Sequence, residues 1–170
     1  MVSASDVSNM MKLSRLVPLT AAIAVCSTGA SAQLPTTRIL TLDVAQTIAS
    51  EALAKCRADG YKVTVLVVDV LNLPKAMFRD DGAIPATTEI AKMKATTTIL
   101  NDRPSGPRTP PPPGTPTAPA TIPGTINAPG GVPIKVDDVT IGAVAVSGAA
   151  AGGDVACANA GIAKAAAKLK

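Results

Sequence analysis

The side chains of this sequence that could do chemistry occur at three places. Arg79, Asp80 and Asp81 follow one another at the end of a predicted hairpin, where they could bind an anion or a metal ion or form a solvated turn. Asp69 ends a buried apolar run, and its carboxylate could act in catalysis or close the next turn through backbone N–H groups. Lys94 stands close to the apolar stripe of a predicted helix. A lysine there is paired, is functional or extends its ammonium to solvent, and we expect the last.

A glycine-rich turn at 147–154 joins a predicted strand to the last predicted helix. Free N–H groups at the start of a helix can hold an anion. The turn matches neither the phosphate-loop motif nor the dinucleotide fingerprint, and Asp154, which we expect to cap the helix, would repel a phosphate. We therefore predict no nucleotide site. Because no acid–base pair stands out, we also predict no catalytic residue.

The composition excludes several classes of site. Among 170 residues there is no His and no Trp, with one Tyr and one Phe. A Cys/His zinc site, a Ser-His-Asp triad and a haem with a proximal His all need an imidazole. Stacking of nucleic-acid bases needs a row of aromatic side chains, and a net charge of +4 without a dense Lys/Arg run gives no phosphate-binding patch. We predict no nucleic-acid partner, and the sequence does not decide whether a metal binds.

Residues 1–32 have the pattern of an export signal. Lys12 and Arg15 form a basic region, 16–25 are apolar, and the small residues at 30–32 form a cleavage site. The apolar region has about ten residues, which is too short to span a bilayer. We therefore expect a periplasmic or secreted protein of bacterial type, with no stable membrane insertion once the signal is removed.

Cleavage after the signal leaves a chain that begins at Gln33, whether translation starts at the first residue or at Met10 or Met11. Two cysteines remain in that chain, Cys56 and Cys157. An even number of cysteines in an exported protein permits a disulfide. The sequence does not decide whether Cys56 and Cys157 form a disulfide. The ends of the first and last predicted helices could meet, but Cys157 lies off the main apolar stripe of its helix.

The elements that must position these residues predict a single α+β domain at 33–170, with an antiparallel sheet flanked by helices. Their order is helix, hairpin, helix, loop, hairpin, helix. A proline-rich loop at about 103–129 interrupts the domain, and 11 of the 15 prolines fall between 104 and 133. This loop could bind a proline-recognising partner, embrace a neighbouring subunit or act as a surface spacer, and we expect a spacer. The predicted helices cover about 41–60, 85–100 and 154–169, and the predicted strands about 61–70, 73–79, 133–136 and 139–147.

Packing predictions follow from the apolar spacing of these elements. Gly142, inside the last strand, predicts a close approach by another backbone or side chain. The inward residues are predicted to be Ala45, Ile48, Ala49, Ala52 and Cys56 in the first helix, Ile90, Met93, Thr97 and Leu100 in the second, and Val155, Ala158, Ile162, Ala165 and Leu169 in the third.

Four segments together resemble the GlcG/HbpS family of haem-binding-type domains. They are LTLDVAQTIASEALAKC at 40–56, VTVLVVDVLNLPKAMFRDDGA at 63–83, EIAKMKATTT at 89–98 and GGVPIKVDDVTIGAVAVSGAAAGGDVACANAG at 130–161. The last segment is the most specific, with GG-x-PI, then IGA-x-x-VSG, then D-x-x-x-A-x-AG. The resemblance implies an α+β domain with an antiparallel sheet that associates into homo-oligomers. Some members are exported and bind haem, and others accompany glycolate or diol utilisation.

The resemblance therefore implies an exported protein that binds a small ligand, with haem as the candidate. The alternatives are a cofactor-free structural or accessory oligomer of the same fold, or an enzyme acting on a small hydroxy acid or a tetrapyrrole, which has the least support. Without His, an axial haem ligand would have to be Tyr61, Met77, Met93, a Cys thiolate, a carboxylate or Lys94, or packing and propionate contacts alone would hold the porphyrin. The predicted ligand-binding residues are Arg79, Asp81 and Lys94, with the two cations positioned to pair with propionates.

Overall fold

Within the described residues, four strands form one antiparallel sheet in the order β2-β1-β4-β3. The computed structural model describes residues 37–107, 113, 122–150 and 152–169. The predicted signal at 1–32 lies outside these residues, as do 108–112 and 114–121 of the predicted proline-rich loop. The elements are α1 Leu42–Ala58, β1 Thr64–Asp69, β2 Pro74–Arg79, α2 Ala86–Asn101, β3 Gly131–Val136, β4 Val139–Ser147, α3 Gly153–Ala165 and the 3-10 turn η1 Ala166–Lys168.

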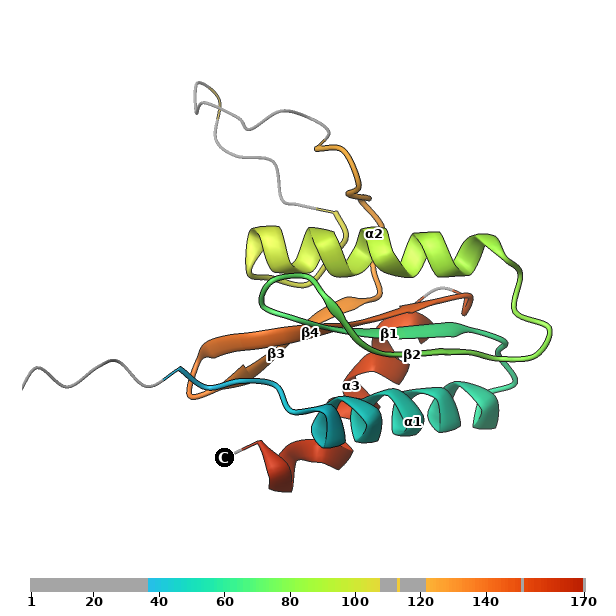
Figure 1. The fold of residues 1–170 in the computed structure, drawn as a ribbon. Coiled ribbons are helices and arrows are strands. Elements are labelled where there is room, and N and C mark those ends of the chain that lie inside the picture. Colours follow the sequence, from blue (N-terminus) through green and yellow to red (C-terminus); the bar gives the residue numbers. More distant parts are fainter. Residues whose placement is uncertain (1–36, 108–112, 114–121, 151, 170) are drawn as a thin grey trace, which may run out of the picture. The chain divides into compact units, whose positions relative to one another are not determined.

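The helices cover both faces of the sheet, α2 on one and α1 with α3 on the other (Figure 1). This confirms the predicted α+β class, the antiparallel sheet and the order of the elements. In the described part of the chain, no helix is long and apolar enough to cross a membrane.

The first helix forms as its local sequence predicts. The Thr41 hydroxyl accepts the Val44 N–H at 3.4 Å, so it occupies the cap position that satisfies a free helix donor. The predicted inward face, which includes Ile48 and Cys56, is fully buried. This face packs against α3 and the sheet, and the Cys56–Cys157 disulfide joins α1 to α3 across a sequence separation of 101 residues. Cys157 is therefore buried against the core, although the apolar spacing placed it off the stripe.

The sheet is centred on β1 and β4, whose register pairs Thr64 with Ser147 and Asp69 with Gly142. A side chain at Gly142 would place its Cβ 2.4 Å from the Val68 carbonyl oxygen, which confirms the close approach predicted there. The carboxylate of Asp69 closes the next turn, because its Oδ1 accepts the backbone N–H groups of Leu71 and Leu73, both at 3.0 Å. That position is structural, as the turn-closing alternative predicts.

The face that α2 presents to the sheet differs from the prediction. Thr97 is buried as expected, but Leu100 is 57% exposed and the face toward the sheet carries Ala91 and Ala95. Both alanines form one buried cluster with Leu66 and Val68 of β1 and with the small side chains Ala143 and Ala145 of β4. Ile90 and Met93 are only half-buried, so the predicted apolar stripe was wrong for three of its four residues.

The last helix also begins differently from the prediction. Its cap residue is Gly152, with φ of 84°, and none of the described side chains caps the helix. Asp154 lies inside the first turn and bonds elsewhere, so the capping prediction was wrong. The buried residues of the helix are Asp154, Cys157, Ala158, Gly161 and Ala165, whereas Val155, Ile162 and Leu169 of the predicted stripe are only partly buried.

Candidate functional site

Buried polar side chains surround α2, in a group that we call the polar seam. They lie where α2 packs against β1, β4 and β3, and the Lys94 side chain links this group to Asp154 in the first turn of α3. Such groups are costly to bury unless they bond to one another, so their concentration on one face distinguishes it from the aliphatic face under α1 and α3. The seam consists of Thr64, Thr87, Lys94, Thr98, Ser105, Ser147 and Asp154.

Lys94 and Asp154 form the charged centre of the polar seam. The Lys94 ammonium donates to Asp154 Oδ2 at 2.7 Å and to the Val146 carbonyl oxygen at 2.9 Å. The two side chains are only 5% and 12% exposed. The expectation that Lys94 reaches solvent was therefore wrong: its charge is compensated inside the protein by a carboxylate 60 positions away in the sequence.

Asp154 extends this link to the glycine-rich turn. Its second oxygen, Oδ1, accepts the Ala149 N–H at 2.9 Å. One carboxylate thus connects α2, through Lys94, to the turn that leads into α3. The Asp154 carboxylate therefore fixes the glycine-rich turn from within and does not leave it open as an anion site.

The two glycines of the GG-x-PI motif allow β3 to approach this centre. A Cβ at Gly130 would lie 2.8 Å from Lys94 Nζ, and one at Gly131 would lie 2.3 Å from the Thr98 hydroxyl. Ser105 completes the contact, because its hydroxyl accepts the Gly131 N–H at 2.8 Å and donates to the Ala128 carbonyl oxygen at 2.7 Å. The motif is thus explained by packing against the polar seam.

The second charged group lies at the β2–α2 turn. Asp80 is 2% exposed, and its Oδ1 accepts a hydrogen bond of 2.9 Å from Arg57 Nη2. This bond from the guanidinium is the main cause that lowers the pKa of Asp80 and raises that of Arg57. The second oxygen, Oδ2, has no hydrogen-bond partner among the described residues and lies 3.7 Å from Lys62 Nζ.

The three predicted ligand-binding residues are not brought together. Arg79 is exposed and donates to the Ala83 carbonyl oxygen within its own turn, and Asp81 is exposed beside it. Lys94 bonds instead to β4 and α3. Among the residues that the structure describes, no group of three or more His, Cys, Asp or Glu could hold a metal ion.

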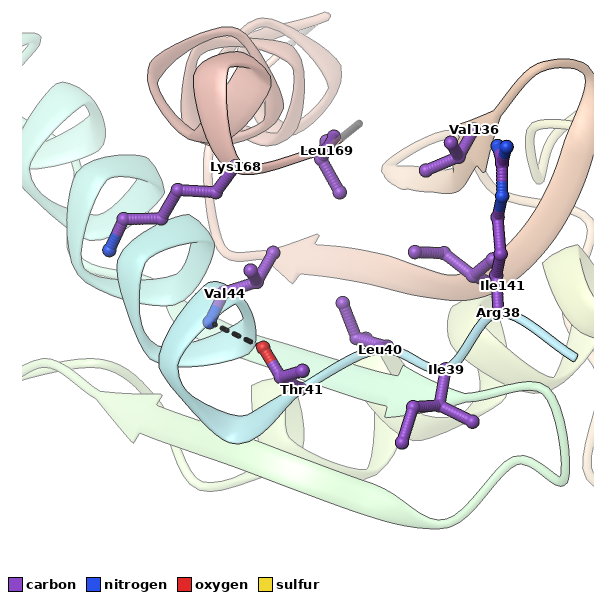
Figure 2. A pocket seen from close by; sticks show the side chains of 9 residues that line it. All are labelled: Arg38, Ile39, Leu40, Thr41, Val44, Val136, Ile141, Lys168 and Leu169. Atoms are coloured by element: carbon purple, nitrogen blue, oxygen red, sulfur yellow. Dashed lines mark hydrogen bonds between the residues drawn. The ribbon is translucent and has the colours of Figure 1, made fainter.

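A cavity of about 210 Å³ opens at the start of α1, and the sequence reasoning did not find it. Figure 2 shows side chains from three separate segments around it: the residues that lead into α1, the β3–β4 region and the C-terminal turn. No single motif could signal a wall assembled from such distant segments. The lining residues are Arg38, Ile39, Leu40, Thr41, Val44, Val136, Ile141, Lys168 and Leu169.

The sequence matches the model of one protein family over most of its length. A model described as "Haem degrading protein HbpS-like" matches residues 40–163, so the chain belongs to the HbpS-like family. No curated protein matches the sequence significantly.

Solved structures agree with this membership. A crystal structure of HbpS shares 28% sequence identity with a TM-score of 0.64, covering 77% of this chain and 93% of that chain. A double mutant of Streptomyces reticuli HbpS also shares 28% identity, with a TM-score of 0.63, covering 84% of this chain and 97% of that one. A PduOC:heme complex shares the fold at 19% identity and a TM-score of 0.61, covering 75% and 95% of the two chains.

The described residues offer few side chains that could be the axial ligand of a haem. The sequence has no His, the Cys56–Cys157 disulfide leaves neither of these cysteines as a thiolate, and the Lys94 ammonium is buried and bonded. None of the nine cavity-lining residues is Met, Tyr or Cys. The remaining candidates, which lie outside the cavity lining, are Tyr61, Met77 and Met93.

Proposed function

We propose that this protein is an exported, small-ligand-binding member of the HbpS-like family. The observation that carries the proposal is the cavity of about 210 Å³ in a chain that keeps the family's fold over residues 40–163. Small-molecule sites are concave and mostly apolar with few polar groups, which describes this lining.

Haem is the first ligand to test, because the family's description and the complex with PduOC name it. Haem is too large for the cavity of about 210 Å³, so in this chain it would be held at another surface, by packing and by contacts to its propionates. Arg79, exposed on β2, is the predicted residue that could make such a contact, whereas the buried Lys94 is already paired.

Titration of the purified protein with haem tests this ligand. If haem binds, the Soret band should shift saturably. The affinity for haem obtained from this shift should be several-fold weaker in Arg79→Met. Lys92→Met is a matched control, because Lys92 is an exposed cation in a surface ion pair with Glu89. A featureless, non-saturating titration would exclude haem and leave the cavity to another small ligand.

A second candidate function is that of a cofactor-free structural or accessory oligomer. The absence of imidazole and the internal pairing of Lys94 with Asp154 favour it. Exposed apolar side chains at the β1–β2 turn, Leu71 at 74% and Leu73 at 57%, offer a surface for self-association. Size-exclusion chromatography with light scattering tests this, and a monomer at micromolar concentration would contradict the oligomer.

Export is tested separately from binding. Expression of the full chain in a bacterium, followed by fractionation and N-terminal sequencing, should recover a periplasmic or secreted protein that begins at Gln33. Recovery of an uncleaved chain from the cytoplasm would contradict export and would leave the binding proposal unaffected.

A further inference from the structure

The cavity at the start of α1 combines an apolar interior with a cation at its edge. In Figure 2 the side chains of Leu40, Val44, Ile141 and Leu169 point into a common space. Leu40, Val44 and Ile141 are between 2% and 7% exposed, so they belong to the buried core, and Leu169 packs against them. A ligand that fills this space replaces water with aliphatic contacts.

Arg38 supplies the charge at this edge. Its guanidinium stands beside Val136 in Figure 2, and its Nη1 pairs with Asp137 Oδ2 at 2.5 Å. The two side chains are 48% and 78% exposed, and an ion pair in that setting contributes little, so a second carboxylate can compete for the guanidinium. Arginine carries five N–H donors in a fork that suits a carboxylate.

Lys168 lines the cavity with its stem and does not add a second charge inside it. Figure 2 shows the side chain running away from the cavity, and its ammonium donates to Asp43 Oδ2 at 2.8 Å and to the Thr47 hydroxyl at 3.2 Å. The Arg38 guanidinium is partly neutralised by Asp137 and lies beside apolar side chains that line the cavity. This arrangement suits a ligand that has one negative charge and an aliphatic chain.

The size of the cavity limits the length of that body. A volume of about 210 Å³ equals about seven water molecules at roughly 30 Å³ each, which corresponds to about six to eight chain carbons. We propose that this cavity binds an aliphatic monocarboxylate of about that length, with the carboxylate on Arg38 and the chain among Leu40, Val44 and Ile141. This inference rests on the proposed function and names the class of its ligand.

Calorimetric titration of the purified protein with octanoate tests the proposal. We expect saturable binding with one octanoate per chain. Hexanoate, which is two methylenes shorter, should bind about fifteenfold more weakly, at about fourfold per methylene. Octanol, which lacks the charge, should bind about tenfold more weakly than octanoate.

Two variants and one control separate the contribution of the Arg38 charge to ligand affinity from that of the apolar side chains lining the cavity. Arg38→Met should weaken octanoate about tenfold and leave octanol unchanged. Leu169→Trp should fill the cavity and abolish binding of both, and as the sole Trp of the chain its fluorescence reports that the cavity wall is folded. Lys92→Met, an exposed ion-paired cation on α2, should bind octanoate like the parent protein.

Equal affinity for octanoate and octanol, or an unchanged octanoate affinity in Arg38→Met, would overturn the proposal. Octanoate heats that fall as protein concentration rises would show that a second copy covers the cavity, and this would also overturn it. Haem binding without octanoate binding would refute the inference and preserve the proposed function. Failure of both ligands would refute the inference and would also remove haem from the proposed function.

Discussion

The two faces of the sheet are built on different physical principles. Under α1 and α3 the core is aliphatic, with fully buried residues such as Ile48 and Val67, and a disulfide joins the two helices. Under α2 the packing uses small side chains such as Ala95, and the polar seam there has the Lys94–Asp154 ion pair at its centre.

The comparison separates stability from specificity. Aliphatic burial and a cross-link stabilise the fold in any arrangement that keeps them buried. A buried ion pair contributes little net stability, but it penalises every arrangement in which either charge loses its partner. We infer that the aliphatic face carries most of the stability, whereas the polar seam fixes the position of α2, β3 and the glycine-rich turn.

Removing the disulfide of the aliphatic face should lower the free energy of unfolding more than any other change considered. The paired replacement Cys56→Ala with Cys157→Ala should lower the free energy of unfolding by roughly 4 to 5 kcal/mol, because the bridge closes a loop of about 100 residues. Urea denaturation monitored by circular dichroism measures the loss. The parent protein under reducing conditions is the control, and a loss below about 1 kcal/mol would contradict the stabilising role of this face.

Breaking the Lys94–Asp154 ion pair of the polar seam should cause the second-largest loss in the free energy of unfolding. Lys94→Met leaves the buried Asp154 carboxylate without its cation and should cost about 3 to 5 kcal/mol. The double replacement Lys94→Met with Asp154→Leu removes both charges and should recover most of that loss. If the double variant is as unstable as the single one in urea, the pair stabilises the fold directly and the contrast between the two faces fails.

A smaller effect is expected at the Asp80–Arg57 pair, whose cation is half exposed. Because the pKa of Asp80 is lowered by the Arg57 hydrogen bond, its stabilising contribution is full above about pH 3.9 and is lost as pH falls through the folded pKa. Asp80→Asn should therefore lower the melting temperature at pH 7, and the difference from the parent protein should shrink toward pH 3. A difference that is constant with pH would exclude this linkage.

The smallest of these effects should be at the cap of α1. Thr41→Ala removes the hydroxyl that accepts the Val44 N–H and should cost about 1 kcal/mol. Thr41→Ser keeps the hydroxyl and should recover most of the loss, as measured by thermal unfolding. Equal destabilisation by both replacements would assign the effect to the methyl group that lines the cavity.

Most of the fold could be predicted because its signals are local. Thr41 and Asp69 act within a few residues of their own positions, through a helix cap and a closed turn. The inward face of α2 could not be predicted in the same way, because short side chains on β4, not the apolar spacing of α2, decide which residues of the helix approach the sheet.

The candidate site was less predictable, because its contacts join distant segments. The sequence singled out Lys94, but its partner Asp154 was read as a helix cap, since nothing in the spacing connects positions 60 residues apart. The cavity is assembled from residues near 40, 140 and 169, and none of the three segments carries a binding motif of its own. Arg38 was missed for this reason.

An amide-resolved NMR titration of the purified protein with octanoate and, separately, with haem tests most directly whether it binds a small ligand. The account predicts saturable shift changes for at least one of them, and for octanoate it predicts that the changes centre on Leu40, Val44, Ile141 and Leu169. The absence of saturable changes with both ligands would contradict it.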